Sequence, residues 1–162
     1  MHEEATEQCK AHLDELLRAG VNCASGLKEI LNDERTALEH QDTEALNEIA
    51  KNKHVFLTRL EELEAERLEL CTTSGFNADP AAMQQLVNSC DTDSLLLGYW
   101  THFVDLAKQC NELNIRNGAI INLRRQQIAG ALAVVRGENQ DNETYGRHGR
   151  DSGSAKRILA EI

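Results

Sequence analysis

The sequence has few aromatic residues and a single proline, and this scarcity argues against a protein built on β-sheets. Aromatic side chains make up 4% of the 162 residues, whereas Ala, Leu, Glu, Gln and Arg are abundant. Aromatic and β-branched residues favour strands, and the abundant residue types favour helices. The composition therefore predicts an all-α protein, and the chain is long enough for one domain with its own core.

Basic residues are not in excess, and no stretch approaches the ~20 apolar residues that a helix needs to cross a bilayer. The formal net charge is −10, and residues 1–71 alone hold 17 acidic against 8 basic side chains. Nucleic acids and anionic membranes bind clusters of Lys and Arg, so neither is an expected partner. No apolar segment typical of a signal peptide follows Met1, and a cytoplasmic location is expected.

The residue spacings that hold metals in helical proteins are missing. Di-iron bundles use a Glu-x-x-His pair on each of two helices, but no histidine here has an acidic residue three positions before it. The five cysteines form no Cys-x-x-Cys pair, so they are predicted to be reduced thiols in the core. No Gly-rich phosphate loop follows a strand. We therefore expect no enzyme activity, no catalytic or metal-binding residue and no cofactor.

Apolar residues recur at steps of four and three from Glu3 to Glu39, which predicts one long helix. A second apolar row beside this seam widens the buried face, as in a bundle. Gly20 and Glu34 interrupt the seam, and each is expected to admit a close neighbour or to lie at an exposed end. Asp42 is the expected N-cap of a second helix that ends before Gly75, and so short a turn places the two helices antiparallel.

A short helix is expected from Pro80 to Cys90, because proline is favoured in a first helical turn. The last long helix should run from about Ser94 to Arg136, and at 1.5 Å per residue it would measure about 65 Å. Its distal half is therefore expected to extend past its partners or to bend. The predicted buried stripe consists of Leu96, Trp100, Phe103, Ala107, Cys110, Asn114, Asn117, Ile121, Arg124, Ile128, Ala131 and Val135.

The stripe contains a polar element, Asn114, Asn117 and Gly118, in the middle of the longest helix. A buried asparagine needs hydrogen-bond partners, and glycine costs a helix about 1 kcal/mol relative to alanine. A polar layer that sets the helix register is one interpretation. A weak point that permits bending or the close approach of another helix is the other.

The composition changes after Gly137. Residues 138–154 contain no aliphatic side chain, which is typical of a segment that stays disordered when alone. The expected domains are thus a helical bundle over 1–137 and a flexible C-terminal tail over 138–162. Tyr145 is a lone aromatic residue in this tail, suited to docking into a partner's pocket. The last eight residues are either a small amphipathic patch at the end of a flexible tether or a frayed end. The predicted fold is an elongated antiparallel bundle or coiled coil of three long helices and one short helix.

These features together resemble the FlgN family of bacterial flagellar export chaperones. The resemblance rests on the Leu-rich first helix, the segment from Leu46 to Lys53, Arg59, Arg67, the turn at Gly75, Trp100, Cys110, Asn114-x-x-Asn117-Gly118 and Thr144-Tyr145-Gly146-x-x-Gly149. It implies a type III export chaperone that binds C-terminal helical segments of hook–filament junction (hook-associated) proteins. It also implies that such a chaperone prevents premature assembly of its cargo and delivers it to the export gate. By the same resemblance, Tyr145 contacts the cytoplasmic domain of the gate protein.

Helical cargo that pairs in the assembled filament exposes an apolar stripe while monomeric, and a chaperone can cover that stripe with a helical groove. The distal half of the last helix offers such a surface, with the tail folding upon it; its residues are Ile120, Ile121, Ile128, Leu132 and Val135. A non-chaperone adaptor or structural component of a secretion apparatus is the alternative function. The sequence does not decide whether the protein forms a homodimer without cargo, which junction protein it prefers or with what affinity. It also leaves open whether Ile158, Leu159 and Ile162 take part in binding and where helix 80–90 packs.

Overall fold

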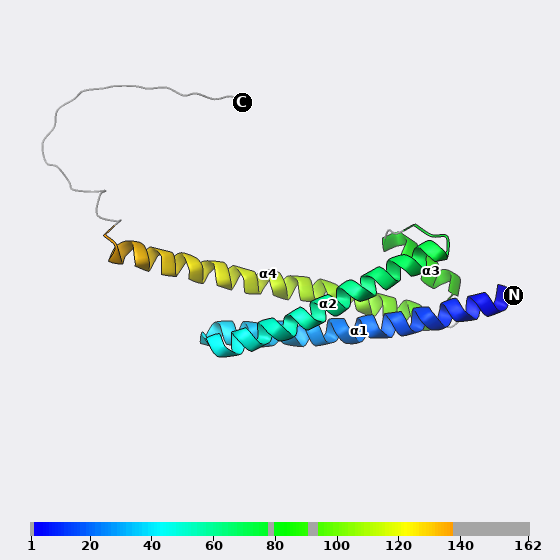
Figure 1. The fold of residues 1–162 in the computed structure, drawn as a ribbon, viewed down its shortest axis with the longest axis horizontal. Helices are drawn as coiled ribbons and strands as arrows, with labels where there is room; N and C mark the ends of the chain where they lie inside the picture. The colour runs from blue at the N-terminus through cyan, green and yellow to red at the C-terminus, as the bar shows by residue number, and fades with distance from the viewer. Residues whose placement is uncertain (1, 78–79, 91–93, 138–162) are drawn as a thin grey trace, which may run out of the picture. The chain divides into compact units, whose positions relative to one another are not determined.

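The computed structural model describes residues 2–77, 80–90 and 94–137, and within these residues every regular element is a helix. The four helices are α1 (His2–His40), α2 (Thr43–Thr73), α3 (Pro80–Cys90) and α4 (Leu95–Val135) (Figure 1). The predicted all-α fold with three long helices and one short helix is confirmed. Each helix begins and ends within about two residues of its predicted bounds, because strong capping residues or polar connectors separate the apolar patterns.

The chain divides into two compact units within α4, Met1–Arg124 and Arg125–Ile162, which are described separately. The first unit contains α1, α2, α3 and most of α4. The second contains the last turns of α4. The predicted boundary between residues 137 and 138 stays a prediction, because the tail lies outside the described residues.

A two-residue turn joins α1 to α2. The backbone N–H groups of Gln41 and Asp42 donate to the carbonyls of Leu38 (3.3 Å) and Ala37 (3.0 Å) and close the end of α1. The carboxylate of Asp42 accepts a hydrogen bond of 2.9 Å from the backbone N–H of Ala45. The predicted N-cap is therefore confirmed, and the turn leaves α1 and α2 antiparallel and side by side (Figure 1).

The end of α2 also has the predicted geometry. Gly75 adopts a φ of 79°, in the left-handed region that favours glycine. Beyond it, the N–H of Phe76 donates to the carbonyl of Cys71 at 2.9 Å, which satisfies one of the unpaired carbonyls at the helix end. The chain can then reverse direction while this carbonyl at the helix end keeps a hydrogen-bond partner.

The core of the first unit is built from all four helices. Met83, Leu86 and Val87 of α3 are almost completely buried and belong to the same cluster as Leu13 and Leu16 of α1. Helix α3 therefore packs on the bundle, which the sequence left open. The remaining buried members of this cluster are Leu17, Cys23, Leu63, Leu70, Cys71, Cys90 and Leu96.

The cysteines lie in or beside this core, as predicted. Four are buried, Cys9 is half-buried, and no disulfide links the five, all of which are in the described part of the chain. Five residues of the predicted buried stripe of α4 are exposed instead: Ala107, Asn114, Ile128, Ala131 and Val135. Leu106 is buried, whereas Ala107, which the sequence pattern placed in the stripe, is exposed. Either residue continues a step of three or four from Phe103, and the larger leucine removes more apolar surface from water.

Two glycines of α1 admit aromatic rings from neighbouring helices. A Cβ at Gly20 would lie 3.2 Å from the ring of Phe103, so the expected close neighbour is present. A Cβ at Gly26 would collide with Cε1 of Phe56. A Cβ at Gly118, in contrast, would meet no atom within 4 Å among the described residues.

We predict opposite effects of alanine at these positions. Gly118→Ala should raise the free energy of unfolding by about 0.5–1 kcal/mol, because alanine is the better helix former and the space is open. Gly26→Ala should lower it by about 1 kcal/mol, because overpacking against Phe56 outweighs the same helical gain. Urea unfolding measures both. Equal stabilisation by the two variants would show that the ring of Phe56 does not constrain Gly26.

Candidate functional site

A polar layer crosses the first unit and joins three helices. Its members are Glu34 of α1, Lys53 of α2, and Asn114 and Asn117 of α4. The Nδ2 group of Asn117 donates to the Leu31 carbonyl and to Oε2 of Glu34, each at 2.8 Å. The ammonium of Lys53 donates to both carboxylate oxygens of Glu34 at 3.1 Å and to Oδ1 of Asn114 at 2.9 Å.

The surroundings of this layer make its register specific. Asn117 is only 1% exposed, and the side chains of Lys53 and Glu34 are 20% and 13% exposed. Buried charges and amides are costly unless they are paired. Sliding α4 along α1 would break the bonds of Asn117 to Leu31 and Glu34. Asn114 is exposed, and Oδ1 of Asn117 has no hydrogen-bond partner among the described residues.

These hydrogen bonds favour the interpretation that the predicted polar element sets the helix register. Asn114 and Asn117 provide the amides of the layer, and Glu34 takes part in it rather than lying at an exposed end. Gly118 has no close neighbour among the described residues. The other interpretation, close approach of another helix at this glycine, is therefore not supported. The sequence showed Glu34 as an interruption of the first apolar pattern and Lys53 only as the end of a segment that supports the family resemblance. Nothing in those patterns predicted that they form an ion pair.

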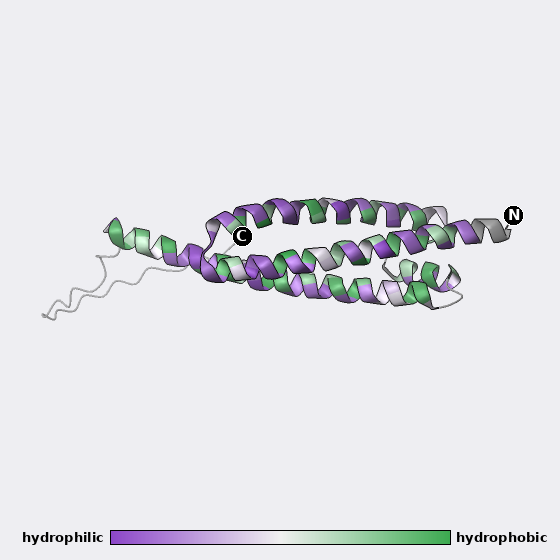
Figure 2. Ribbon diagram, turned by 90° about the horizontal axis from the view of Figure 1, so that it is seen from below, coloured by the Kyte–Doolittle hydropathy of each residue, from purple (hydrophilic) through white to green (hydrophobic). Residues whose placement is uncertain are grey.

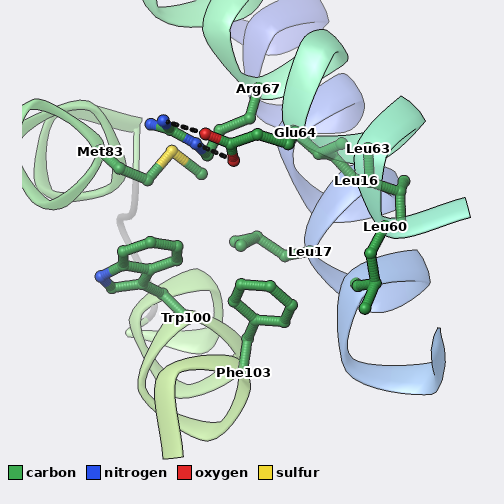
Figure 3. A pocket seen from close by; sticks show the side chains of 10 residues that line it. Leu16, Leu17, Leu60, Leu63, Glu64, Arg67, Met83, Trp100 and Phe103 are labelled. Carbon is green, nitrogen blue, oxygen red and sulfur yellow. Dashed lines mark hydrogen bonds and ion pairs between the residues drawn. The ribbon is translucent and has the colours of Figure 1, made fainter. Parts of the chain in front are cut away.

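A small apolar cavity lies among the four helices of the first unit. Its volume is about 40 Å³, and Leu17, Met83, Trp100 and Phe103 are among the side chains that point into it (Figure 3). At one side, Arg67 donates two hydrogen bonds of 2.7 and 2.8 Å to the carboxylate of Glu64. These bonds lower the pKa of Glu64 and raise that of Arg67. A space of this size is far below the ~300 Å³ of a ligand pocket, so it is a packing gap.

The predicted cargo-binding residues differ in exposure along α4. In the second unit, Ile128, Leu132 and Val135 are 62%, 47% and 83% exposed. Their steps of four and three place them on one face of the helix, and Figure 2 shows these last turns of α4 as largely hydrophobic. In the first unit, Ile120 and Ile121 are half-buried. Such an exposed apolar face is unusual unless a partner covers it.

Four further exposed apolar residues of α4 lie outside the predicted surface: Leu95, Ile115, Leu123 and Val134. They stand off the predicted stripe, and burial of the neighbouring turns could not be judged from spacing alone. Tyr145, Ile158, Leu159 and Ile162 lie outside the described residues.

Two negative findings concern the described residues alone. Over 2–77, 80–90 and 94–137, no three His, Cys, Asp or Glu side chains gather in a group suited to a metal ion. In the same ranges, no helix has the length and apolar character required to cross a membrane.

The family comparison decides the class of protein. Residues 10–153 match the family model described as FlgN protein. The chain belongs to the FlgN family. Members of the FlgN family are flagellar export chaperones rather than enzymes. The FlgN match includes the polar layer, the exposed face of α4 and Tyr145, and it ends before Ile158. No curated protein and no solved structure matches the chain.

The polar layer of this FlgN-family bundle gives a stability prediction. Lys53→Met should lower the free energy of unfolding by about 1–3 kcal/mol, because it leaves the half-buried Glu34 carboxylate without its cation. Lys51→Met is the matched control. Lys51 pairs with Glu48 on the same helix, but the two side chains are 71% and 64% exposed, so a change within about 0.5 kcal/mol is expected. Similar losses in urea unfolding would refute a special role for the layer.

Proposed function

We propose that this FlgN-family protein is a cytoplasmic type III export chaperone for hook-associated proteins. It binds the C-terminal helical segments of these hook–filament junction proteins, prevents their premature assembly and delivers them to the export gate. The observation that carries the proposal is the exposed apolar face of Ile128, Leu132 and Val135 at the end of α4. The family match supports a chaperone role in flagellar export.

The spacing of this face suits a helical cargo. Residues at i, i+4 and i+7 form the contact row that one helix offers to another in helix-in-groove binding. Fully burying a side chain of this size contributes roughly 1.5–3 kcal/mol, so three such residues can hold an amphipathic helix. The proposed cargo surface also includes Ile120 and Ile121, which contribute less because they are already half-buried.

The tail has two proposed roles. It folds onto bound cargo, and the entropy lost in ordering it weakens binding, which suits a chaperone that must release its cargo. Tyr145 docks into the cytoplasmic domain of the export gate protein. The family match covers Tyr145, which supports this assignment.

A negative charge placed on the apolar face tests the cargo site. Ile128→Glu should weaken binding of a peptide spanning the C-terminal helical segment of a hook-associated protein by at least tenfold in titration calorimetry. The physical reason is that the complex would bury an unpaired carboxylate in place of an apolar side chain. Arg124 and Arg125, one turn earlier, can pair with the new glutamate in the free protein, so the helix should stay formed.

Ile115→Glu is the matched control, since Ile115 is 63% exposed on the same helix. It should leave the peptide affinity within about twofold of the wild type. Equal losses in both variants would place the cargo site elsewhere. If the wild-type protein binds no hook-associated segment, the chaperone proposal fails. The result would then favour the alternative of a non-chaperone adaptor.

A separate experiment tests the gate contact. Tyr145→Ala should keep the affinity for cargo peptide but lose binding of the chaperone–cargo complex to the cytoplasmic domain of the gate protein. The expected reason is the loss of the only aromatic side chain in residues 138–162, which is the proposed anchor. Calorimetric titration of the gate domain with each complex measures the effect. Unchanged gate affinity would refute the assignment of Tyr145.

A further inference from the structure

Two cysteines from distant parts of the sequence lie against each other in the first unit. The Sγ atoms of Cys9 in α1 and Cys90 in α3 are 3.7 Å apart. Their sulfurs touch at the end of the bundle where α3 packs on the first helix. Cys90 is buried and Cys9 is half-buried, so the pair lies near enough to the surface for one thiol to meet a small reagent.

The neighbours of this pair are hydroxyl groups. The Oγ of Ser74 is 3.8 Å from the sulfur of Cys9, and the Oγ of Ser89 is 3.7 Å from that of Cys90. Burial raises the pKa of the Cys90 thiol, and the hydroxyl of Ser89 and the charge of Lys10 act in the opposite direction. Ser89 and Lys10 thus offset part of the effect that burial has on the Cys90 thiol.

The other three cysteines point to different groups. The thiols of Cys23 and Cys110 donate to the backbone carbonyls of Phe56 and Ala24, each at 3.4 Å. The sulfur of Cys71 lies 4.0 Å from that of Met83 in the buried core. These surroundings are typical of structural thiols that pack as small apolar groups.

We propose that Cys9 and Cys90 are a redox-sensitive pair that forms a reversible disulfide when the protein meets a low-molecular-weight disulfide such as glutathione disulfide. The sulfurs must approach from contact distance to the ~2.05 Å of a covalent bond, a shift that side-chain rotation and a small movement of α3 supply. In a reducing compartment such bonds are transient and serve redox sensing.

The chemistry proceeds by two exchanges. The thiolate of Cys9, the more exposed of the pair, attacks one sulfur of glutathione disulfide and releases a glutathione thiolate. The thiol of Cys90 then loses its proton and attacks the Sγ of Cys9, which releases the second glutathione thiolate. The protein loses two electrons and two protons, and one glutathione disulfide becomes two glutathione molecules.

The bond would fasten α3 to α1. It would close a loop between residues 9 and 90, which restricts the unfolded chain strongly because the loop is long. Helix α3 contributes Met83, Leu86 and Val87 to the core. Oxidation should therefore raise the melting temperature by roughly 5–15 °C and slow backbone hydrogen exchange in residues 81–90, and a dithiol reductant should reverse both changes.

Peptide mapping tests the pairing directly. Full-length protein is reduced, incubated with glutathione disulfide, alkylated and digested with trypsin and an enzyme that cleaves before Asp. The expected major product links the peptide ending at Lys10 to the peptide 79–90; Cys71 falls on a different fragment, 68–78. Three outcomes would overturn the proposal. They are a glutathione adduct that stays on Cys9, a major product that links another pair of cysteines, and no reaction at all.

Two variants complete the test. Cys90→Ser should retain one glutathione on Cys9 and show no rise in melting temperature after oxidation. Cys23→Ala removes a thiol outside the pair and should leave both the cross-link and the temperature shift unchanged. If oxidised Cys90→Ser shows the same rise in melting temperature, the Cys9–Cys90 disulfide is not the cause of that rise. None of these readouts involves cargo, so their outcome is independent of the chaperone proposal.

Discussion

The half-buried ion pair between Glu34 and Lys53, with the two amides of α4 around it, sets the alignment on which the first unit depends. Apolar side chains would accept several registers of three long helices, because leucine packs against leucine at many offsets. In the observed register the ammonium of Lys53 reaches both Glu34 and Asn114. The layer therefore contributes specificity, and the surrounding leucines contribute most of the stability.

Once this register is set, α4 presents different residues to solvent at its two ends. Leu96 and Leu106 are buried in the first unit, whereas Ile128, Leu132 and Val135 in the second unit are exposed. The helix continues without a proline or cap between them. An exposed apolar face on an otherwise ordinary amphipathic helix is what a helix-binding chaperone requires.

Much of the fold was predictable because local signals agreed with one another. The apolar periodicity marked the long helices, and Asp42 and Gly75 marked their ends through hydrogen bonds made within a few residues. The polar element at Asn114 and Asn117 was recognised for the same reason, since amides in an apolar stripe stand out. Where two local choices were equivalent, as at Leu106 and Ala107, spacing could not decide and side-chain volume did.

The sequence by itself determined the all-α class, the helix ends, the predicted burial of the cysteines and the resemblance that the family match confirmed, because each depends on residues close together in the chain. Only the tertiary structure decided the pairing of Glu34 with Lys53, the packing of α3, the ring of Phe56 against Gly26 and the contact of Cys9 with Cys90. Each of these joins residues from different helices, and a periodic pattern records which face of a helix is buried but not which partner covers it.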